Sequence, residues 1–293
     1  MRIARTSLPD AAWAASDDGE TWHSLATVVA PDASTVDVIA ATERIRTERA
    51  GGTLSTVELS DTDLLAPVVR PSKILCIGLN YGEHVAEAGE DTPAAPIVFA
   101  KFPSALTSPS GDIELDPALT QQCDYEVELA VIIGRTARRV SEADALDHVY
   151  GYTVANDVSA RDHQFADGQW DRSKSFDTFC PVGPWITTAD EVPDPQALRL
   201  TTTVNGKLRQ DASTGQMLHG IAYLIHYLSR GMTLEPGDVI LTGTPAGVGL
   251  ALDPPSFLQV GDLVECRVER LGAIRNQVTT PVGADTTVLA RAR

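Results

Sequence analysis

Beyond the first quarter of the chain, hydrophobic residues occur in short runs that polar or turn-forming residues interrupt. Two mainly apolar segments, 73–78 and 97–101, are typical of buried strands. Around 264–268, Val and Cys alternate with Glu and Arg, which is the period of two expected of a half-buried strand. Asn205-Gly206 lies inside the strand-like segment 201–210 and predicts a hairpin with a two-residue turn. This part of the chain is therefore predicted to be rich in strands.

Two segments instead carry apolar residues at helical spacing. Positions 218, 221, 225 and 228 form an apolar stripe that predicts a helix over 216–230, with Gly231 at its end. Ser34 and Gly51-Gly52 are suitable start and stop signals for a second helix over 35–50. Strands do not alternate with long helices, and no G-x-G-x-x-G follows the first strand, which argues against a doubly wound nucleotide-binding sheet. The predicted fold class is α+β with strands dominant.

Residues 1–66 are predicted to form a small N-terminal α/β module. Asp17-Asp18-Gly19 between two Trp-containing segments indicates a hairpin, and the predicted helix over 35–50 follows it. Pro67 and Pro71 mark the expected boundary, so that 67–293 would form the main domain. No residue of the first module suggests chemistry.

Composition narrows the classes of partner. The 293 residues include 23 basic and 40 acidic ones, and the net charge of -17 argues against nucleic acid and anionic membranes as partners. The four Cys form no C-x-x-C pair, which favours reduced thiols. The sequence shows neither a signal-peptide pattern nor an apolar run of membrane-spanning length. We expect a soluble cytoplasmic protein.

The strongest chemical signal is a set of three carboxylates. Glu126 and Glu128 lie two apart in the strand-like segment D-Y-E-V-E-L-A-V-I-I, so both project from one face. Adjacent carboxylates repel one another unless a cation lies between them. With Asp157 on a second strand-like segment, they predict a site for a hard cation, namely Mg²⁺, Mn²⁺ or Ca²⁺. A solvated strand edge would show the same E-x-E spacing, and spacing alone leaves both interpretations open.

Two further segments carry candidate catalytic residues. His84 and Glu87 are three apart and would share one helix face, where the carboxylate could raise the basicity of the imidazole. A surface ion pair is the alternative. Lys174 lies among aromatic and small residues, where it could stabilise an enolate or bind a carboxylate, or could simply extend to solvent beside Asp171.

Candidate substrate contacts follow from two loops. Arg161 and Gln164 come four and seven residues after Asp157 and could bind substrate oxygens, although ordinary loop polarity explains them equally well. The segment L-T-G-T-P-A-G-V-G contains Gly243 and Thr244, whose backbone and hydroxyl could hold a carboxylate. It is not a P-loop, because no Lys-Ser/Thr follows its last Gly.

Taken in order, these segments resemble the fumarylacetoacetate hydrolase family. The matching motifs, which span roughly 73–280, are G-L-N-Y-G-E-H-V-A-E, D-Y-E-V-E-L-A-V-I-I-G, A-N-D-V-S-A-R-D-H-Q, K-S-F-D-T-F-C-P-V-G-P, L-E-P-G-D-V-I-L-T-G-T-P-A-G-V-G and V-G-D-L-V-E-C-R-V. The resemblance implies a mixed β-roll, a homodimer and a bound Mg²⁺ or Mn²⁺, with Ca²⁺ as a substitute. The implied roles are those named above: metal ligands Glu126, Glu128 and Asp157; catalytic His84, Glu87 and Lys174; substrate contacts Arg161, Gln164, Gly243 and Thr244.

The resemblance also implies a small anionic 2-oxo acid as substrate. The leading expectation is a metal-dependent hydrolase that cleaves a carbon–carbon bond of an acylpyruvate or fumarylpyruvate-like acid through a stabilised enolate. Alternatives are an oxaloacetate-type decarboxylase, a 2-hydroxyhepta-2,4-diene-1,7-dioate-type isomerase and a ureidoglycolate lyase. A non-enzymatic metal-binding module is the remote alternative, because it would leave the candidate base and cation without roles.

Overall fold

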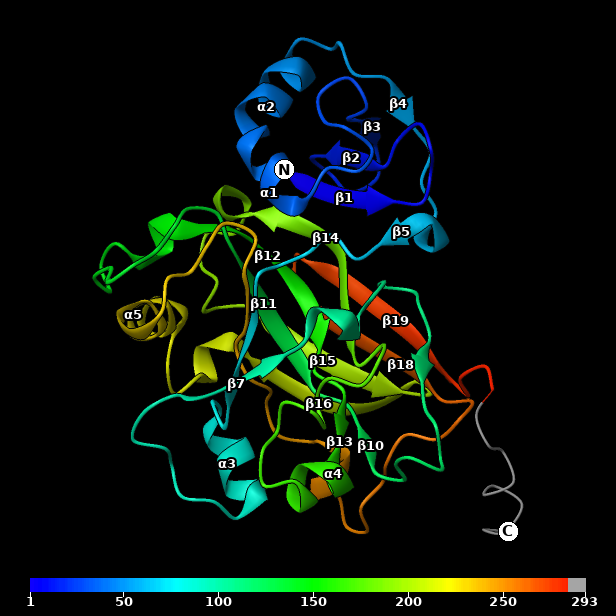
Figure 1. Ribbon diagram of the computed structural model, residues 1–293, viewed down its shortest axis with the longest axis vertical. Coiled ribbons are helices and arrows are strands. Elements are labelled where there is room, and N and C mark those ends of the chain that lie inside the picture. Colours follow the sequence, from blue (N-terminus) through cyan, green and yellow to red (C-terminus); the bar gives the residue numbers. More distant parts are fainter. Residues whose placement is uncertain (284–293) are drawn as a thin grey trace.

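The computed structural model describes residues 1–283, and within them one large mixed sheet continues from the N-terminal part into the main body of the molecule (Figure 1). Ten of its strands follow one another across the sheet, and two short strands pair beside this path. In order they are β4 (Thr56–Val57), β3 (Trp22–Ser24), β2 (Trp13–Ser16), β1 (Arg2–Thr6), β14 (Cys180–Thr188), β12 (Val149–Asn156), β11 (Val127–Ile133), β17 (Val239–Leu241), β6 (Ile74–Gly78) and β7 (Ile97–Lys101), with β5 (Leu64–Leu65) beside β1 and β8 (Leu106–Thr107) beside β14.

Strand β11 is the centre of this sheet. All seven of its residues are buried, including Glu128, and the others are aliphatic. It pairs antiparallel with β12, where Glu128 lies opposite Ala155, and antiparallel with β17 on its other side. A strand buried on both faces is expected to be a continuous hydrophobic run, so the single carboxylate within it stands out.

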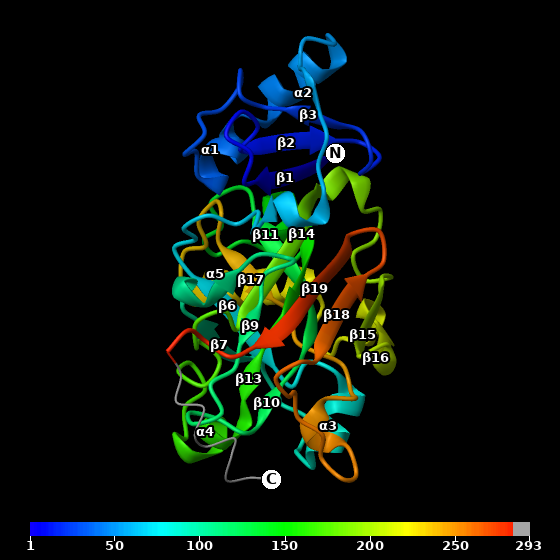
Figure 2. The ribbon, with the colours of Figure 1, turned by 90° about the vertical axis from the view of Figure 1, so that its right-hand side faces the viewer.

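A second sheet of five strands covers one face of β11, β12 and β14 (Figure 2). Its strands are β16 (Lys207–Ser213), β15 (Arg199–Val204), β18 (Leu263–Val268), β19 (Gly272–Thr279) and β9 (Ile113–Glu114), while β10 (Cys123–Asp124) and β13 (Ser159–Ala160) form a separate pair. The predicted hairpin is present, with Asn205 and Gly206 in the left-handed turn between β15 and β16. The main hydrophobic core lies between the two sheets. The strand-dominated α+β class is confirmed.

The main part of the molecule also contains the short helices α3 (Gly82–Ala88), α4 (Arg161–Ala166) and α5 (Ile221–Gly231), and the buried residues of α5 join the main core. The helix expected over 216–230 begins only at Ile221, and Leu218, assigned to its buried stripe, is 38 % exposed. The segment before the helix pairs instead with the loop after β6, where the Asn80 side chain bonds the backbone N–H and C=O of His219. These contacts hold the chain out of the helix until Ile221.

The N-terminal part has its own apolar cluster and two helices, α1 (Thr35–Ala40) and α2 (Thr42–Ala50), in place of the single helix expected over 35–50. At the break, the Thr42 hydroxyl hydrogen-bonds with both the Val38 carbonyl and the Tyr150 hydroxyl. Strand β1 pairs with β14 and so continues the large sheet. The domain boundary at 66/67 stays a prediction.

No helix within residues 1–283 is long and apolar enough to cross a membrane. The homodimer and the cytoplasmic location stay predictions.

Candidate active site

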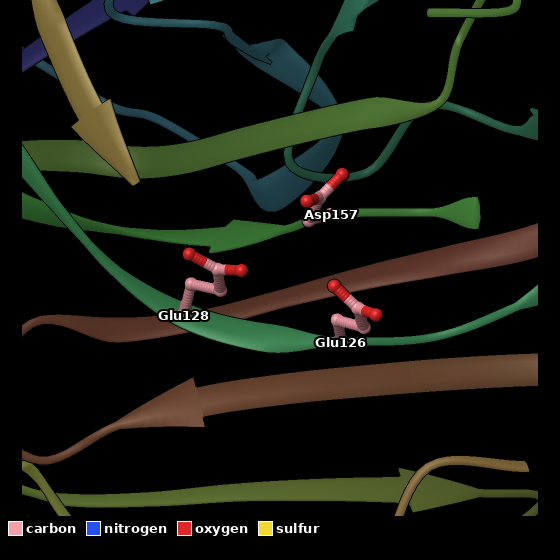
Figure 3. A group of neighbouring side chains, drawn as sticks. All are labelled: Glu126, Glu128 and Asp157. Carbon is pink, nitrogen blue, oxygen red and sulfur yellow. The ribbon is translucent and has the colours of Figure 1, made fainter. Parts of the chain in front are cut away.

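The three predicted metal ligands meet at the centre of the large sheet (Figure 3). Glu128 lies in β11, Glu126 immediately precedes it, and Asp157 immediately follows β12, with its N–H donated to the Glu126 carbonyl. One carboxylate oxygen from each residue lies within 4.8 Å of the other two. Glu126, Glu128 and Asp157 are 4 %, 1 % and 0 % exposed, which excludes the solvated strand edge.

Three cationic side chains surround the carboxylates. The Lys174 ammonium lies 2.7 Å from Glu126 Oε2 and 3.0 Å from Asp157 Oδ2, so it bridges two of the three acids. Lys101, at the end of β7, lies 2.6 Å from Asp157 Oδ1 and also donates to the backbone carbonyl of Lys174. Arg161 Nη2 lies 2.7 Å from Glu126 Oε1. All three cations are buried, and such groups are tolerated inside a protein only when they are paired.

The pKa values of Glu126 and Glu128 are shifted in opposite directions. Burial raises the pKa of Glu126, but the Lys174 ammonium and the Arg161 guanidinium outweigh it and bring this pKa to about 2. Burial and the neighbouring Asp157 and Glu126 charges instead raise the pKa of Glu128 well above its usual value. Glu128 therefore favours its neutral, protonated form, because the three cations pair with Glu126 and Asp157 and not with Glu128.

The residues present fit a divalent cation. Three carboxylates without a Cys or His in the cluster form an all-oxygen donor set, which Mg²⁺, Mn²⁺ and Ca²⁺ prefer. The positive charge of such an ion would stabilise the ionised form of Glu128. Glu128 Oε2 already accepts a 2.6 Å hydrogen bond from the Gly243 N–H, which orients its carboxylate.

His84 and Glu87 form the predicted pair on α3. His84 Nδ1 lies 2.7 Å from Glu87 Oε1, and the other oxygen of Glu87 accepts the Gly247 N–H at 2.9 Å. Because a carboxylate only accepts, Nδ1 carries the proton and Nε2 is the basic nitrogen. His84 lines the cavity that also contains Glu126 and Glu128, so the imidazole belongs to the same site.

The glycine-rich loop after β17 is held by a buried amide. Gln210, on β16 of the second sheet, donates to the Thr244 hydroxyl and the Pro245 carbonyl, each at 2.8 Å. Its carbonyl accepts from the Val127 N–H at 3.0 Å and from the Thr202 hydroxyl at 2.7 Å. Gln210 is fully buried, so these contacts tie the loop to the start of β11. Thr244 lines the cavity, whereas the Gly243 N–H is used by Glu128.

The last two predicted residues also line the cavity. Arg161 donates through Nη1 to Gln164 Oε1 at 3.0 Å and through Nε to Asp124 Oδ2 at 2.9 Å. Asp124 also accepts the N–H groups of Gly249 and Leu250, so it links Arg161 to the loop after β17. The structure thus brings all ten predicted residues to one region.

Sequence reasoning missed Lys101, Asp124 and Gln210. Asp124 belongs to the same D-Y-E-V-E segment as the metal ligands, and that position was a signal that could have found it. Lys101 ends an apolar strand, where a lysine normally extends to solvent. Gln210 lies in a hairpin strand with polar neighbours, and nothing in that pattern marks it as buried.

Comparisons with known proteins identify one family. Residues 73–279 match the family model described as "Fumarylacetoacetate (FAA) hydrolase C-terminal". The oxaloacetate tautomerase FAHD2B, mitochondrial, of Bos taurus is 48 % identical over 221 residues, which cover 75 % of this chain and 70 % of that protein.

Solved structures of the same kind superimpose on almost the whole chain, each covering 96 % of it. A fumarylacetoacetate hydrolase from Exiguobacterium antarcticum has a TM-score of 0.84 at 39 % identity and is covered completely. The 2-hydroxyhepta-2,4-diene-1,7-dioate isomerase from Mycobacterium marinum gives 0.74 at 37 %, with 99 % of it covered. Maleylpyruvate hydrolase from Sphingobium sp. SYK-6, in complex with manganese(II) and pyruvate, gives 0.79 at 33 %, with 99 % covered.

Proposed function

The chain belongs to the fumarylacetoacetate hydrolase family of enzymes, and from this premise we propose that it catalyses divalent-metal-dependent enolisation of a small 2-oxo acid. The leading reaction is keto–enol tautomerisation of an oxaloacetate-like acid. The relatives named oxaloacetate tautomerase support this choice, because their identity to the chain exceeds that of the hydrolase and isomerase structures. Enolisation is also the chemistry that a base and an enolate-stabilising cation in one cavity can perform.

One observation carries the proposal: a basic nitrogen and a buried ammonium line the same cavity as the carboxylate cluster. The basic nitrogen is Nε2 of His84, since Nδ1 is held by Glu87. The ammonium is that of Lys174, whose neighbours Asp157 and Glu126 raise its pKa against the effect of burial and keep it charged. General bases placed in this way contribute roughly 10² to 10⁴ in rate.

The proton transfer follows from these positions. His84 Nε2 takes the proton from carbon three of the acid, and the electron pair of that C–H bond forms the C2–C3 double bond. The oxygen on carbon two becomes an enolate oxygen, which the Lys174 ammonium stabilises. The imidazolium then returns the proton to this oxygen, which yields the enol and restores the neutral imidazole. Glu87 stabilises the imidazolium while it exists.

A divalent ion held by Glu126, Glu128 and Asp157 would supply Lewis-acid polarisation of the carbonyl. We propose Mg²⁺ or Mn²⁺, supported by the oxygen donor set and by the manganese in the maleylpyruvate hydrolase neighbour. The carboxylate of the acid would meet the Arg161 guanidinium and the Gln164 amide, which line the cavity beside Glu126.

Hydrolysis of a carbon–carbon bond is the second candidate. The His84–Glu87 pair that favours it could take a proton from water instead of from carbon. The hydroxide would attack a carbonyl on carbon four, and the bond between carbons three and four would break. The leaving group is then the same enolate that Lys174 would stabilise.

The test uses protein stripped of metal by a chelator, with Mg²⁺ or Mn²⁺ added back. We expect metal-dependent loss of the ultraviolet absorbance of enol-oxaloacetate, and a loss of about 10² or more in this rate for His84→Ala. The control is His148→Ala, whose imidazole bonds a backbone carbonyl outside the cavity. Pyruvate release from an acylpyruvate, measured in parallel, divides hydrolysis from tautomerisation. A metal-loaded protein inactive in both assays would rule out the proposal.

A further inference from the structure

The cavity continues from the carboxylates toward an aromatic wall that the enolisation chemistry does not use. Its lining includes Gly78 on β6, Phe99 on β7 and Trp170 from the loop that precedes Lys174. β17 lies between β11 and β6 in the sheet, and the Phe99 ring centre lies 5.3 Å from the Lys174 ammonium, so this wall adjoins the charged end of the cavity. A ligand bound at the carboxylates could therefore extend toward it.

The wall depends on a missing side chain. Gly78 and Cys76 project from the same face of β6, and the Cα partner of Cys76 is Phe99. The Trp170 ring packs edge-on against Phe99, with ring centres 5.3 Å apart. A Cβ atom at Gly78 would lie 2.6 Å from Cζ3 of Trp170. The backbone at Gly78 is not in the left-handed region, so the requirement for glycine here is one of space.

The loop backbone places Trp170 independently of its ring. Its carbonyl accepts the Lys174 N–H and the Ser173 hydroxyl, and the adjacent Asp171 accepts the Ala100 N–H from β7. The loop therefore keeps anchors that a smaller side chain at position 170 would leave in place.

Charge distinguishes the two ends of the cavity. Among the described residues that line it, the lysine and arginine side chains are Lys174 and Arg161, and both lie 2.7 Å from Glu126. The rest of the lining is largely apolar and includes Leu79, Phe165 and Val248, while the exposed Glu90 adds a negative charge to it. The Lys174 ammonium lies 5.3 Å from the Phe99 ring centre but is already paired with Glu126 and Asp157. A carboxylate placed at the aromatic wall would therefore meet no unpaired lysine or arginine among these residues, and Glu90 would add to the negative charge around it.

We propose that the Trp170–Gly78 pair determines substrate specificity, and that the site prefers 2-oxo acids with an uncharged, apolar tail beyond carbon three. This inference rests on the proposed enolisation. A short dicarboxylic acid such as oxaloacetate stays within the charged end, and a longer acid places its tail against Trp170 and Phe99. Each methylene that such a pocket accepts is worth a factor of roughly 10 or more in kcat/KM.

The test compares 2-oxohexanoate with 2-oxohexanedioate, which have six carbons each and end in a methyl group and a carboxylate, respectively. Exchange of the protons on carbon three with deuterated water, followed by NMR with Mg²⁺ or Mn²⁺ present, reports enolisation of both. We expect kcat/KM to favour the methyl-ended acid by about tenfold or more. Trp170→Ala removes the wall and should reduce this ratio severalfold.

Gly78→Ala provides a second, opposite change. The added methyl group pushes the ring into the cavity, so exchange of 2-oxohexanoate should fall more than exchange of oxaloacetate. The matched control is Phe102→Ala, an aromatic residue 51 % exposed that follows β7 and does not line the cavity. It should leave the ratio unchanged.

The outcomes separate the two proposals. Metal-dependent exchange with equal or better use of the carboxylate-ended acid would overturn the specificity assignment and leave the proposed function intact. A ratio that neither Trp170→Ala nor Gly78→Ala alters would do the same. No metal-dependent exchange on any of the acids, including oxaloacetate, would overturn the proposed function itself and the specificity with it.

Discussion

The two halves of the candidate active site are supported very differently. The carboxylate half is built into the central strands, where the side chains of Glu126 and Asp157 are 6 % and 0 % exposed. The base half is the seven-residue helix α3, whose His84 and Glu87 side chains are 12 % and 20 % exposed. A hydrogen bond to Gly247 ties Glu87 to the rest of the site. The sheet therefore fixes where a cation would bind, whereas the position of the base depends on a few local contacts.

The largest effect is expected at the carboxylate half. Asp157→Ala removes the carboxylate that pairs with both Lys101 and Lys174, and leaves two buried ammonium groups undercompensated. Breaking buried pairs in this way costs about 3–5 kcal/mol. We expect denaturant unfolding to show a loss of this size and calorimetry to show no metal binding.

Asp167→Ala is the matched control, because that carboxylate pairs with Arg172 at the surface. It should change neither measurement appreciably. If Asp157→Ala were as stable as the parent, the ion pairs of Asp157 with Lys101 and Lys174 would not contribute to the stability of the fold.

A substitution in the base half should lower activity strongly and change stability little. His84→Ala removes the basic nitrogen and should lower the rate of enolisation by about 10² to 10⁴. Because α3 contributes one buried residue, Val85, to the core, the free energy of unfolding should change little. Kinetics and metal titration on the same preparation check both statements.

Glu87→Gln sharpens this prediction. The amide oxygen can still accept the Gly247 N–H, but the negative charge beside the imidazole is lost. Its activity should fall between those of the parent and His84→Ala. Loss of metal binding in either variant would contradict the separation of the two halves.

Gln210 connects the halves, because its amide contacts both the start of β11 and the loop that holds Gly247. Gln210→Met keeps the approximate volume but leaves its buried partners unsatisfied, which costs about 1–3 kcal/mol. Loss of residues that orient ligands typically lowers metal affinity by about 10- to 100-fold. Unfolding and calorimetry measure both, with the exposed Gln277→Met as control. Unchanged metal affinity would mean that the loop is positioned without Gln210.

The smallest effect is expected where charges are exposed. Arg199 pairs with Asp211 across β15 and β16, and hydrogen bonding to Arg199 lowers the pKa of Asp211. Solvent and salt screen such pairs, so Arg199→Ala should unfold at nearly the parent denaturant concentration in physiological salt. If Arg199→Ala lost as much free energy of unfolding as Asp157→Ala, burial would not explain why the two ion pairs differ in their contribution to stability.

Much of the site could be predicted because its chemistry is local in sequence. The E-x-E spacing on a strand and the i,i+3 spacing of His84 and Glu87 each place two side chains together without knowledge of the fold. The fold class followed similarly from short strand-like segments. To interpret these signals, only the side-chain periodicity of a strand or a helix has to be known.

The rest depends on contacts between distant segments. Lys101 ends β7 at the edge of the sheet and bonds Asp157, which follows β12 four positions away in the strand order, and no local pattern encodes that approach. Leu218 has the right spacing for a helix, but Asn80 binds the adjacent backbone and moves the start of α5. Tertiary hydrogen bonds therefore overrode local propensity where the prediction was wrong.

The parallel pairing of β17 with β6 has a consequence for the order of assembly. Val239 lies beside Ile74, and the loop that follows β17 delivers the Gly243 N–H to Glu128. Such distant pairing forms slowly, because chain entropy must be lost before the contacts form. During synthesis, β6, β11 and β12 are all made before the strand that completes them. The carboxylate site is therefore completed only after a late segment of the chain has folded. Protection of the Gly243 N–H from hydrogen exchange would report when its bond to Glu128 has formed.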